Sequence, residues 1–177
     1  MIKIKQLIRE TNFEKMLMEG VYDPGIFKAF FLAGGPGSGK TFVTASAFAG
    51  TGLKVVNSDT AFERGLKKAN LSLKMPDEEE YFRNIIRQRA KTLTSSQLDT
   101  YVLGRLGLVV DATGRDYNTI QRQYNACKVL GYDCYMIFVN TSLDVALQRN
   151  LLRPRSIPEY IVKTSWNTVQ QNIGKFQ

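Results

Sequence analysis

The sequence predicts an α/β fold in which a parallel sheet of four or five strands is covered by helices on both faces. Two observations lead to this prediction: short apolar runs alternate with longer segments of helical periodicity, and a glycine-rich loop directly follows the first run. Strands that alternate with helices are typical of parallel sheets, because each crossover helix packs back onto the sheet. The chain has 177 residues, 44% of them hydrophobic, which is enough for one domain with its own core.

The expected elements follow one another along the chain. Residues 3–19 have apolar positions at helical spacing and predict an amphipathic N-terminal helix, which ends before the turn VYDPG. Apolar and β-branched residues predict strands at 29–33, 53–57, 106–111 and 132–140. Helices are predicted at 40–50, 60–69, 76–104, 116–130, 142–152 and 158–173. We therefore expect a helical arm over 1–24 and one domain over 25–177.

The loop GGPGSGKT, residues 34–41, fits the pattern G-x-x-x-x-G-K-[ST] in full, which a plain turn does not require. Its glycines let backbone N–H groups point into one concavity, and the following helix adds unpaired N–H groups there. Lys40 is predicted to reach the β- and γ-phosphates of ATP, and the Thr41 hydroxyl to bind Mg²⁺. The fold is thus a P-loop NTPase-type, three-layer fold. Its nucleotide site is predicted at Gly35, Pro36, Gly37, Ser38, Gly39, Lys40 and Thr41.

The composition narrows the chemistry. The chain has no histidine, so a general base must be a carboxylate, lysine, tyrosine or cysteine. The net charge of +8 and the pI near 9.5 favour a nucleic acid or another anionic partner beside the nucleotide. No apolar run approaches the roughly 18 residues of a membrane span. Cys127 and Cys134 are expected to be reduced, in the cytoplasm or, for a phage-encoded protein, in the host cytoplasm.

Ligands of parallel sheets bind beyond the carboxyl ends of the strands, so the residues after each predicted strand are candidates for catalysis and binding. A P-loop domain usually adds another strand after its last helix. No strand pattern follows the predicted helix at 158–173, so we expect that last strand to be absent or to lie beyond the sequence. The candidates are Asp59 after the second strand, Asp111, Thr113, Arg115 and Asp116 after the third, and Arg149, Arg153 and Arg155 beyond the fourth.

These candidates separate the subclasses of P-loop protein. A motor-type or AAA-type ATPase needs an acid pair in which a glutamate activates water, yet Asp111 is followed by Ala112. A GTPase needs N-K-x-D for guanine, and NTSLD lacks the lysine. A small P-loop kinase needs an acceptor-binding carboxylate and arginines on a lid. Asp59 supplies the carboxylate, and the arginines are Arg149, Arg153 and Arg155. The pattern therefore favours a kinase.

The motifs resemble those of the phage polynucleotide kinase and zeta-toxin group of P-loop kinases over residues 30–158. NSD resembles the strand tip that carries the catalytic aspartate, and DATGRD resembles the third-strand motif of the zeta-type members. RNLLR resembles the lid motif in which two arginines grip donor phosphates. The resemblance implies that the catalytic residues are Lys40, Asp59, Arg149 and Arg153, with a lid around 149–158 and Arg153 also binding ATP.

One position departs from the group. An arginine commonly follows the catalytic aspartate by three residues, and Phe62 stands there instead, with Arg64 two residues later. Arg64 is therefore the candidate for acceptor recognition. Asp111 is either a water-mediated Mg²⁺ ligand together with Thr41 or an acceptor-binding residue. The predicted acceptor site consists of Asp59, Arg64, Asp111, Thr113 and Arg115.

Several candidates have a plainer interpretation. Asp59 is alternatively a helix N-cap, because Ser58-Asp59 precedes a helical pattern. Arg149 and Arg153 are one turn apart on a predicted helix, and alternatively form a solvated basic face. The same choice, between a solvated face and the lining of an anionic groove, holds for Arg83, Arg87 and Lys91. Tyr81, Phe82 and Trp166 are expected in the core.

The predicted function is transfer of the γ-phosphoryl group from ATP, with Mg²⁺, to a hydroxyl on a nucleic acid (a DNA or RNA end, or a modified base) or on a nucleotide. A zeta-toxin-like nucleotide-sugar kinase is the enzymatic alternative, and it predicts a small acceptor pocket. A nucleotide-binding module without catalysis is the alternative of a different class, and it predicts no phosphate transfer in any assay.

Overall fold

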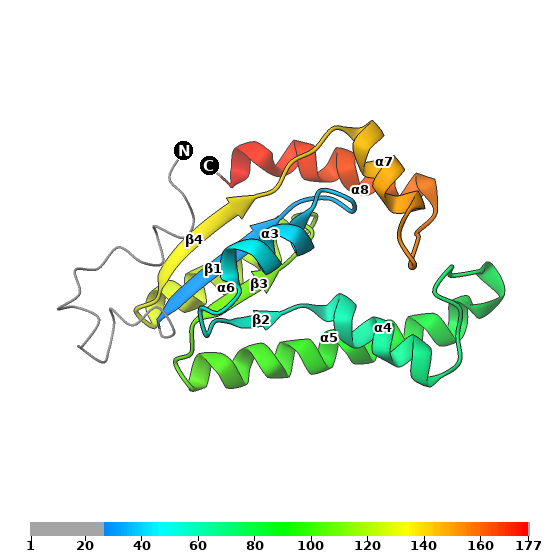
Figure 1. Ribbon diagram of the computed structural model, residues 1–177. Helices are drawn as coiled ribbons and strands as arrows, with labels where there is room; N and C mark the ends of the chain where they lie inside the picture. The colour runs from blue at the N-terminus through cyan, green and yellow to red at the C-terminus, as the bar shows by residue number, and fades with distance from the viewer. Residues whose placement is uncertain (1–26, 177) are drawn as a thin grey trace.

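The computed structural model describes residues 27–176, which form a four-stranded sheet and six α-helices (Figure 1). The strands are β1 (Lys28–Ala33), β2 (Lys54–Val56), β3 (Leu108–Asp111) and β4 (Asp133–Phe138). The α-helices are α3 (Lys40–Phe48), α4 (Ser58–Lys68), α5 (Glu80–Leu103), α6 (Tyr117–Val129), α7 (Leu143–Leu151) and α8 (Glu159–Asn172), with 3₁₀ turns η1 (Asp77–Glu79) and η2 (Ile173–Lys175). The helix predicted at 3–19 and the arm over 1–24 lie outside the described residues.

The strands run parallel in the order β2-β3-β1-β4. All six residues of the central strand β1 are buried, as expected for a continuous apolar strand between two helical layers. The chain leaves β1 toward one edge to form β2, and leaves β3 toward the other edge to form β4. The pair β1–β3 is therefore the topological switch point, where ligands of such sheets bind. Because Leu32 pairs with Asp111, the phosphate loop and the loop after β3 begin side by side.

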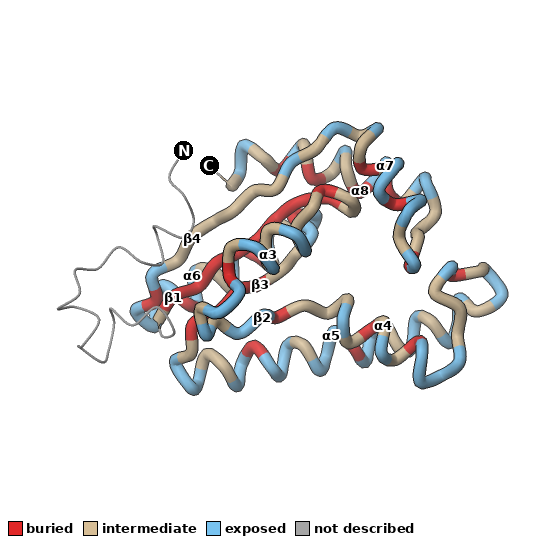
Figure 2. Tube along the Cα trace, viewed as in Figure 1, coloured by how far each residue is buried: buried red, intermediate tan, exposed pale blue. Residues whose placement is uncertain are grey.

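Helices cover both faces of the sheet, because alternate residues of β1 point to opposite sides. Phe31 belongs to a core cluster with Leu98 of α5 and Ile120 of α6. Phe30 faces the other way and packs on Phe48 of α3, with ring centroids 5.0 Å apart. Figure 2 shows that burial is concentrated along β1. The predicted three-layer α/β fold is confirmed.

The predicted helices and strands within residues 27–176 are all present, with boundaries that differ by a few residues. The helix predicted from 76 begins with the 3₁₀ turn η1, and α5 follows at Glu80. The prediction that Tyr81 and Phe82 lie in the core is wrong, since they are 71% and 61% exposed. Helix α5 packs on α4 through Ile86 and Ala90, and this contact turns the other side of α5 toward solvent.

The cysteines lie between α6 and β4 in the core cluster and are not joined. Cys127 is buried and Cys134 is half-buried, and both are free thiols, as predicted. Within residues 27–176, no helix combines the length and the apolar character that crossing a membrane requires.

Candidate active site

A cleft of about 1730 Å³ opens at the carboxyl ends of the strands. It is lined by the phosphate loop, by α4 and α5, by the start of α6, and by the segment from α7 to α8. This volume exceeds the roughly 300–1,000 Å³ typical of small-molecule sites, so it has room for two substrates. The predicted residues that line the cleft are Gly35, Pro36, Gly37, Ser38, Gly39, Lys40, Thr41, Asp59, Asp111, Thr113, Arg115, Arg149 and Arg153.

Arg64 is the predicted site residue that the structure moves away from the cleft. It is exposed on α4 and does not line the cleft. Phe62 and Leu66 bury one side of α4, while Asp59 and Glu63, one turn apart, face the cleft. A residue next to Glu63 is turned by about 100° around the helix axis and therefore points elsewhere. The expectation that Arg64 contacts the acceptor is corrected accordingly.

The phosphate loop curls tightly around the start of α3. Gly37 has φ +76°, and a Cβ at this position would lie 2.5 Å from the carbonyl oxygen of Ala146, so both conformation and space require glycine. Helix α3 begins after Gly39 with no side-chain cap and no acidic residue in its first turn. Its first N–H groups are therefore left for an anion, as a nucleotide-phosphate site requires.

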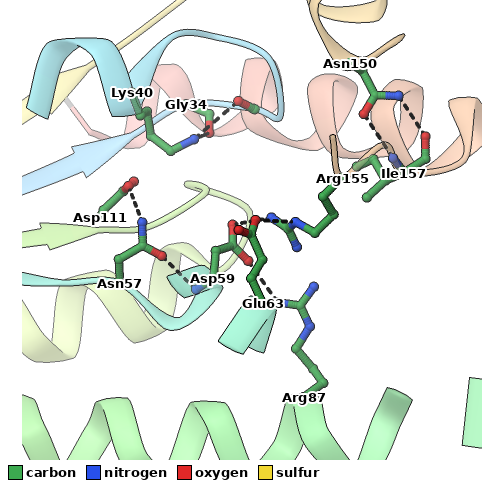
Figure 3. Close-up of polar contacts among 11 residues, drawn as sticks. Gly34, Lys40, Asn57, Asp59, Glu63, Arg87, Asp111, Asn150, Arg155 and Ile157 are labelled. Carbon is green, nitrogen blue, oxygen red and sulfur yellow. Dashed lines mark hydrogen bonds and ion pairs between the residues drawn. The ribbon is translucent and has the colours of Figure 1, made fainter. Parts of the chain in front are cut away.

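Two cationic side chains lie on the carbonyl groups of this loop. Lys40 Nζ donates to Gly34 O at 2.6 Å and to Gly35 O at 3.3 Å (Figure 3). Arg149 Nη1 donates to Gly37 O at 3.1 Å and to Ser38 O at 3.3 Å. Burial lowers the pKa of Lys40, although the carboxylates of Asp111 and Asp59 oppose the shift. Positive charge thus gathers at the loop where phosphates of ATP would bind.

Asp111 supplies an unpaired oxygen beside the loop. Its Oδ2 accepts from Asn57 Nδ2 at 2.7 Å, whereas Oδ1 is buried and has no hydrogen-bond partner among the described residues. Burial raises the pKa of Asp111, while the nearby ammonium group of Lys40 lowers it. A buried carboxylate oxygen without a partner is costly unless a ligand completes it. This oxygen is therefore a candidate for contact with a bound ion or substrate.

These residues fit a Mg²⁺ ion that is shared with the nucleotide. Mg²⁺ usually takes one or two protein oxygens and completes its shell with phosphates and water. The Thr41 hydroxyl and Asp111 Oδ1 are such oxygens in the same cleft. No group of three or more acidic, cysteine or histidine side chains with metal-site geometry occurs in residues 27–176, so the described part forms no metal cage of its own.

Asp59 lies between two arginines. Arg87 Nη1 donates to Asp59 Oδ1 at 2.9 Å, and Arg155 Nη2 lies 3.0 Å from Asp59 Oδ2. Arg155 Nε lies 2.8 Å from Glu63 Oε1, so this guanidinium group pairs with both carboxylates on the cleft side of α4. Burial by itself raises the pKa of Asp59, but Arg155 and Arg87 outweigh it and hold this pKa below its ordinary value. The carboxylate is therefore ionised across the neutral pH range.

Asp59 is not the helix cap that one interpretation assigned to it. The N-cap of α4 is Asn57, whose Oδ1 accepts from the backbone N–H of Asp59 at 2.7 Å. Asp59 stands in the first turn of α4 and points into the cleft (Figure 3). Its side chain thus has no capping role and lies on the cleft side of α4, paired with the two arginines.

An aromatic ring supports the two arginines at Asp59. The guanidinium carbon of Arg87 lies 3.8 Å from the ring centroid of Phe62, and that of Arg155 lies 5.7 Å from it. Phe62 occupies the position at which the resembling kinases commonly have an arginine. Positive charge next to Asp59 therefore comes from α5 and from the segment after α7, and not from α4 itself.

Arg153 does not stand on the same helix as Arg149, contrary to the prediction. Helix α7 ends at Leu151, and Arg153 lies in the loop that leads to α8. Asn150, which is buried, closes this loop: its Nδ2 donates to Ile157 O at 2.8 Å and its Oδ1 accepts from Ile157 N at 3.1 Å. Both arginines still line the cleft, Arg149 from α7 and Arg153 from the loop that follows it.

The motif after β3 forms the part of the cleft wall that lies beside the phosphate loop. Thr113 O accepts from Gly34 N at 3.2 Å, which joins the two loops at the switch point. Gly114 has φ +79°, and a Cβ there would lie 2.9 Å from Ala33 Cβ, so glycine is required. Asn172 Nδ2 donates to the carbonyl oxygens of Gly114 and Arg115 at 3.0 and 3.1 Å. The side chains of Thr113 and Arg115 are thus held at the cleft by two elements.

Asn57 and Glu63 have no predicted role in the site. Arg155 is predicted only as one of the lid arginines, not as a partner of Asp59, and Arg87 has two interpretations. Arg87, with Arg83 and Lys91 of the same helix, lines the cleft, so the groove interpretation of these three residues agrees with their location. Asn57 carried a signal in the sequence, because it is the last residue of the second predicted strand. Arg155 and Glu63 are brought together only by the loop between α7 and α8, and no sequence spacing indicates this contact.

Replacement of Arg149 by alanine is expected to weaken ATP binding about tenfold. A hydrogen bond from a charged group contributes about 1.5–3 kcal/mol, and Arg149 fixes two carbonyls of the phosphate loop. The single tryptophan, Trp166, lies beside the phosphate loop, because a Cβ added to Gly35 would be 4.0 Å from its Cδ1. Its fluorescence is therefore expected to change when ATP binds. Arg64→Ala is the matched control and should bind ATP like the wild type. Equal affinities for all three proteins, measured by tryptophan fluorescence, would contradict this role.

The sequence matches one family profile over almost its whole length. The AAA_33 profile, described as "AAA domain", matches residues 30–175. The description names a P-loop domain and not a reaction, so the missing glutamate after Asp111 does not conflict with it. No curated protein matches the sequence.

Solved structures share the fold at low identity. A structure of the Pnkp1/Rnl/Hen1 RNA repair complex matches with a TM-score of 0.63 and 19% identity, covering 86% of this chain and 47% of the other. A complex of AvrRxo1-ORF1 and ORF2 with ATP gives a TM-score of 0.63 at 18% identity, covering 84% and 49%. The PezAT toxin–antitoxin system of Streptococcus pneumoniae gives 0.59 at 16%, covering 85% and 61%.

The chain spans about half the length of the first two of these structures. At such low sequence identity, the similarity shows a shared fold only. The resemblance to P-loop kinases that the motifs predicted is confirmed at the level of family and fold. The match over residues 30–175, together with the phosphate loop at the switch point, shows that the chain belongs to the AAA_33 family of P-loop domains.

Proposed function

We propose that this protein is an ATP- and Mg²⁺-dependent kinase that transfers the γ-phosphoryl group to a hydroxyl on a nucleic acid or a nucleotide. The observation that carries the proposal is that a complete phosphate loop and the ionised carboxylate of Asp59 line the same cleft. Asp111 interacts electrostatically with both Lys40 and Asp59, so the three groups are close together. A donor site beside a carboxylate is the arrangement that phosphoryl transfer to a hydroxyl needs.

The side chains divide the reaction between them. Lys40 and the N–H groups at the start of α3 bind the β- and γ-phosphates. Thr41 and Asp111 would hold Mg²⁺, which would neutralise phosphate charge there. The acceptor oxygen attacks the γ-phosphorus, the bond to the β–γ bridging oxygen breaks, and Asp59 takes the hydroxyl proton. Arg149 and Arg153, which line the cleft, stabilise the charge of the transferred group in this proposal. Positioning and electrostatics supply most of the rate.

A transfer screen with γ-labelled ATP tests the proposal. The acceptors are DNA ends, RNA ends, nucleosides and nucleotide sugars, each assayed with and without Mg²⁺, and phosphate release without acceptor is the hydrolysis control. Label on a nucleic acid or nucleotide supports the proposal. Label on the nucleotide sugar alone would identify the zeta-toxin-like alternative. ATP binding without transfer to any acceptor would identify a binding module.

The net charge of the residues that line the cleft indicates which kind of acceptor it can bind. Eight cationic side chains line it against six carboxylates: Lys40, Arg83, Arg87, Lys91, Arg115, Arg149, Arg153 and Arg155 against Asp59, Glu63, Asp77, Glu80, Asp111 and Asp116. Two of these carboxylates, Asp59 and Glu63, are already paired with arginine. The remaining cations favour a phosphate-bearing acceptor, but the excess is small, so salt dependence is the decisive measurement.

Binding of a nucleic-acid acceptor is expected to weaken steeply with salt. The log–log slope is about −0.7 to −0.9 for each phosphate contacted, so three or four contacts cost about two orders of magnitude between roughly 50 and 200 mM salt. Fluorescence anisotropy of a labelled oligonucleotide measures the slope. A nucleotide sugar has only two phosphates, and a slope shallower than about −1.5 would exclude the nucleic-acid acceptor.

Lys91→Gln is expected to flatten that slope by about one unit. Lys91 lines the cleft one turn beyond Arg87. A change at Arg87 itself would also disturb the proposed base, because Arg87 donates to Asp59. Lys67→Gln, an exposed lysine of α4 outside the cleft, is the matched control and should leave the slope unchanged. An equal slope for both variants would remove Lys91 from the acceptor site.

A further inference from the structure

We infer that Asn57 is a positioning residue, which turns one carboxylate oxygen of Asp111 toward the bound nucleotide while it caps α4. The inference rests on the proposed function, because Asp111 there shares Mg²⁺ with ATP. Asn57 touches neither substrate in this scheme; it acts through Asp111 and through the first turn of α4.

The sheet register brings the two residues together. Val56 of β2 pairs with Val110 of β3, so the next residue on each strand, Asn57 and Asp111, meet at the carboxyl edge of the sheet. Asn57 Nδ2 donates to Asp111 Oδ2 at 2.7 Å, and Asn57 Oδ1 accepts from Asp59 N at 2.7 Å (Figure 3). One amide thus joins the metal-side carboxylate to the helix turn that carries the proposed base.

The orientation of this amide has one solution. The backbone N–H of Asp59 can only donate, so the amide oxygen must face it and the NH₂ group must face Asp111. With Oδ2 held by that NH₂ group, the carboxylate cannot rotate without losing a short hydrogen bond. Oδ1 is then the oxygen presented to a ligand, and it is the buried oxygen that lacks a partner in the described residues.

The competing explanation is that Asn57 only caps α4. The substitution Asn57→Ser distinguishes this capping role from the positioning of Asp111. Serine is as good an N-cap as asparagine, but it has no NH₂ group for Asp111. Asn57→Ser therefore keeps the cap and loses the carboxylate contact, whereas Asn57→Ala loses both. If Asn57 only capped α4, the Asn57→Ser variant would behave like the wild type in every measurement.

The experiment measures two quantities on the whole protein. Thermal unfolding compares the two contacts: Asn57→Ser loses only the hydrogen bond to Asp111, whereas Asn57→Ala loses the cap as well and should show the lower Tm of the two. Trp166 fluorescence reports how a non-hydrolysable ATP analogue binds at increasing free Mg²⁺. Because loss of a residue that orients a metal ligand typically costs about 10–100-fold in metal affinity, both variants should need about 10–100-fold more Mg²⁺ for half-maximal tightening. Transfer activity is not part of this readout.

A double-mutant cycle adds a control, since Asn57→Ser should have no further effect on the Mg²⁺ requirement once Asp111 is alanine. A wild-type Mg²⁺ requirement for Asn57→Ser would overturn the inference and leave the proposed function intact. An additive effect in the cycle would also overturn it. Analogue binding by the wild type that ignores Mg²⁺ would overturn the proposed function and the inference together.

Discussion

Lys40→Ala is expected to lower phosphoryl transfer by at least about 10³-fold, the upper end of the effect of one preorganised donor. Lys40 follows the loop glycines at the start of α3, and its Nζ lies within hydrogen-bonding distance of two loop carbonyls. When ATP binds, this ammonium group can exchange those neutral acceptors for charged phosphate oxygens. The charge is needed most where negative charge builds up in the transition state, so the loss falls mainly on turnover.

Single-turnover transfer from γ-labelled ATP measures this effect, with the acceptor that the screen identifies. Lys40→Met is the matched variant, because it keeps most of the side-chain volume and removes only the charge. Both variants should keep their far-UV circular dichroism, since the core clusters do not include Lys40. Near-wild-type turnover in either variant would remove the donor site from GGPGSGKT.

The order of elements could be predicted from the sequence because each element carries a local signal. The run KAFFLA is buried throughout because it is the central strand, and the loop pattern that follows it is specified by glycine geometry at Gly37 and Gly39. The sheet order needs more than this. Nothing in four separate apolar runs says that β3 lies between β1 and β2, which is what places Asp111 beside the phosphate loop.

The predicted site was incomplete for a related physical reason. Residues at strand tips were found because parallel strands end at one edge, and Asp59, Asp111 and Thr113 all line the cleft. Arg155 is different: it is 7% exposed and reaches Asp59 only because Asn150 closes the loop from Leu151 to Ile157 through two hydrogen bonds. That loop also takes Arg153 off the helix, although the i, i+4 spacing with Arg149 is typical of a helical pair.

Asp59→Asn is expected to cut turnover by about two to four orders of magnitude, the usual contribution of a general base. Asparagine keeps the shape of the side chain and cannot take a proton. ATP binding, followed through Trp166, should change far less than turnover, because Asp59 belongs to α4 and its ion pairs are with Arg87 and Arg155. Its charge also acts on Lys40, so a small change in ATP affinity is expected. A collapse of ATP affinity with turnover retained at saturating ATP would instead assign Asp59 to the metal site.

The pH dependence provides a second test of the same residue. The pKa of Asp59 is raised by burial but lowered further by Arg155 and Arg87, so the net shift is downward. A base acts only when deprotonated, and activity should therefore fall only below the ordinary carboxylate range. Arg87→Met removes one of the two cations, which raises the pKa of Asp59 and moves the acid limb of kcat to higher pH. Arg89→Met, on the exposed side of α5, is the matched control and should leave the limb in place. An acid limb that stays fixed in Arg87→Met would show that the titrating base is not Asp59.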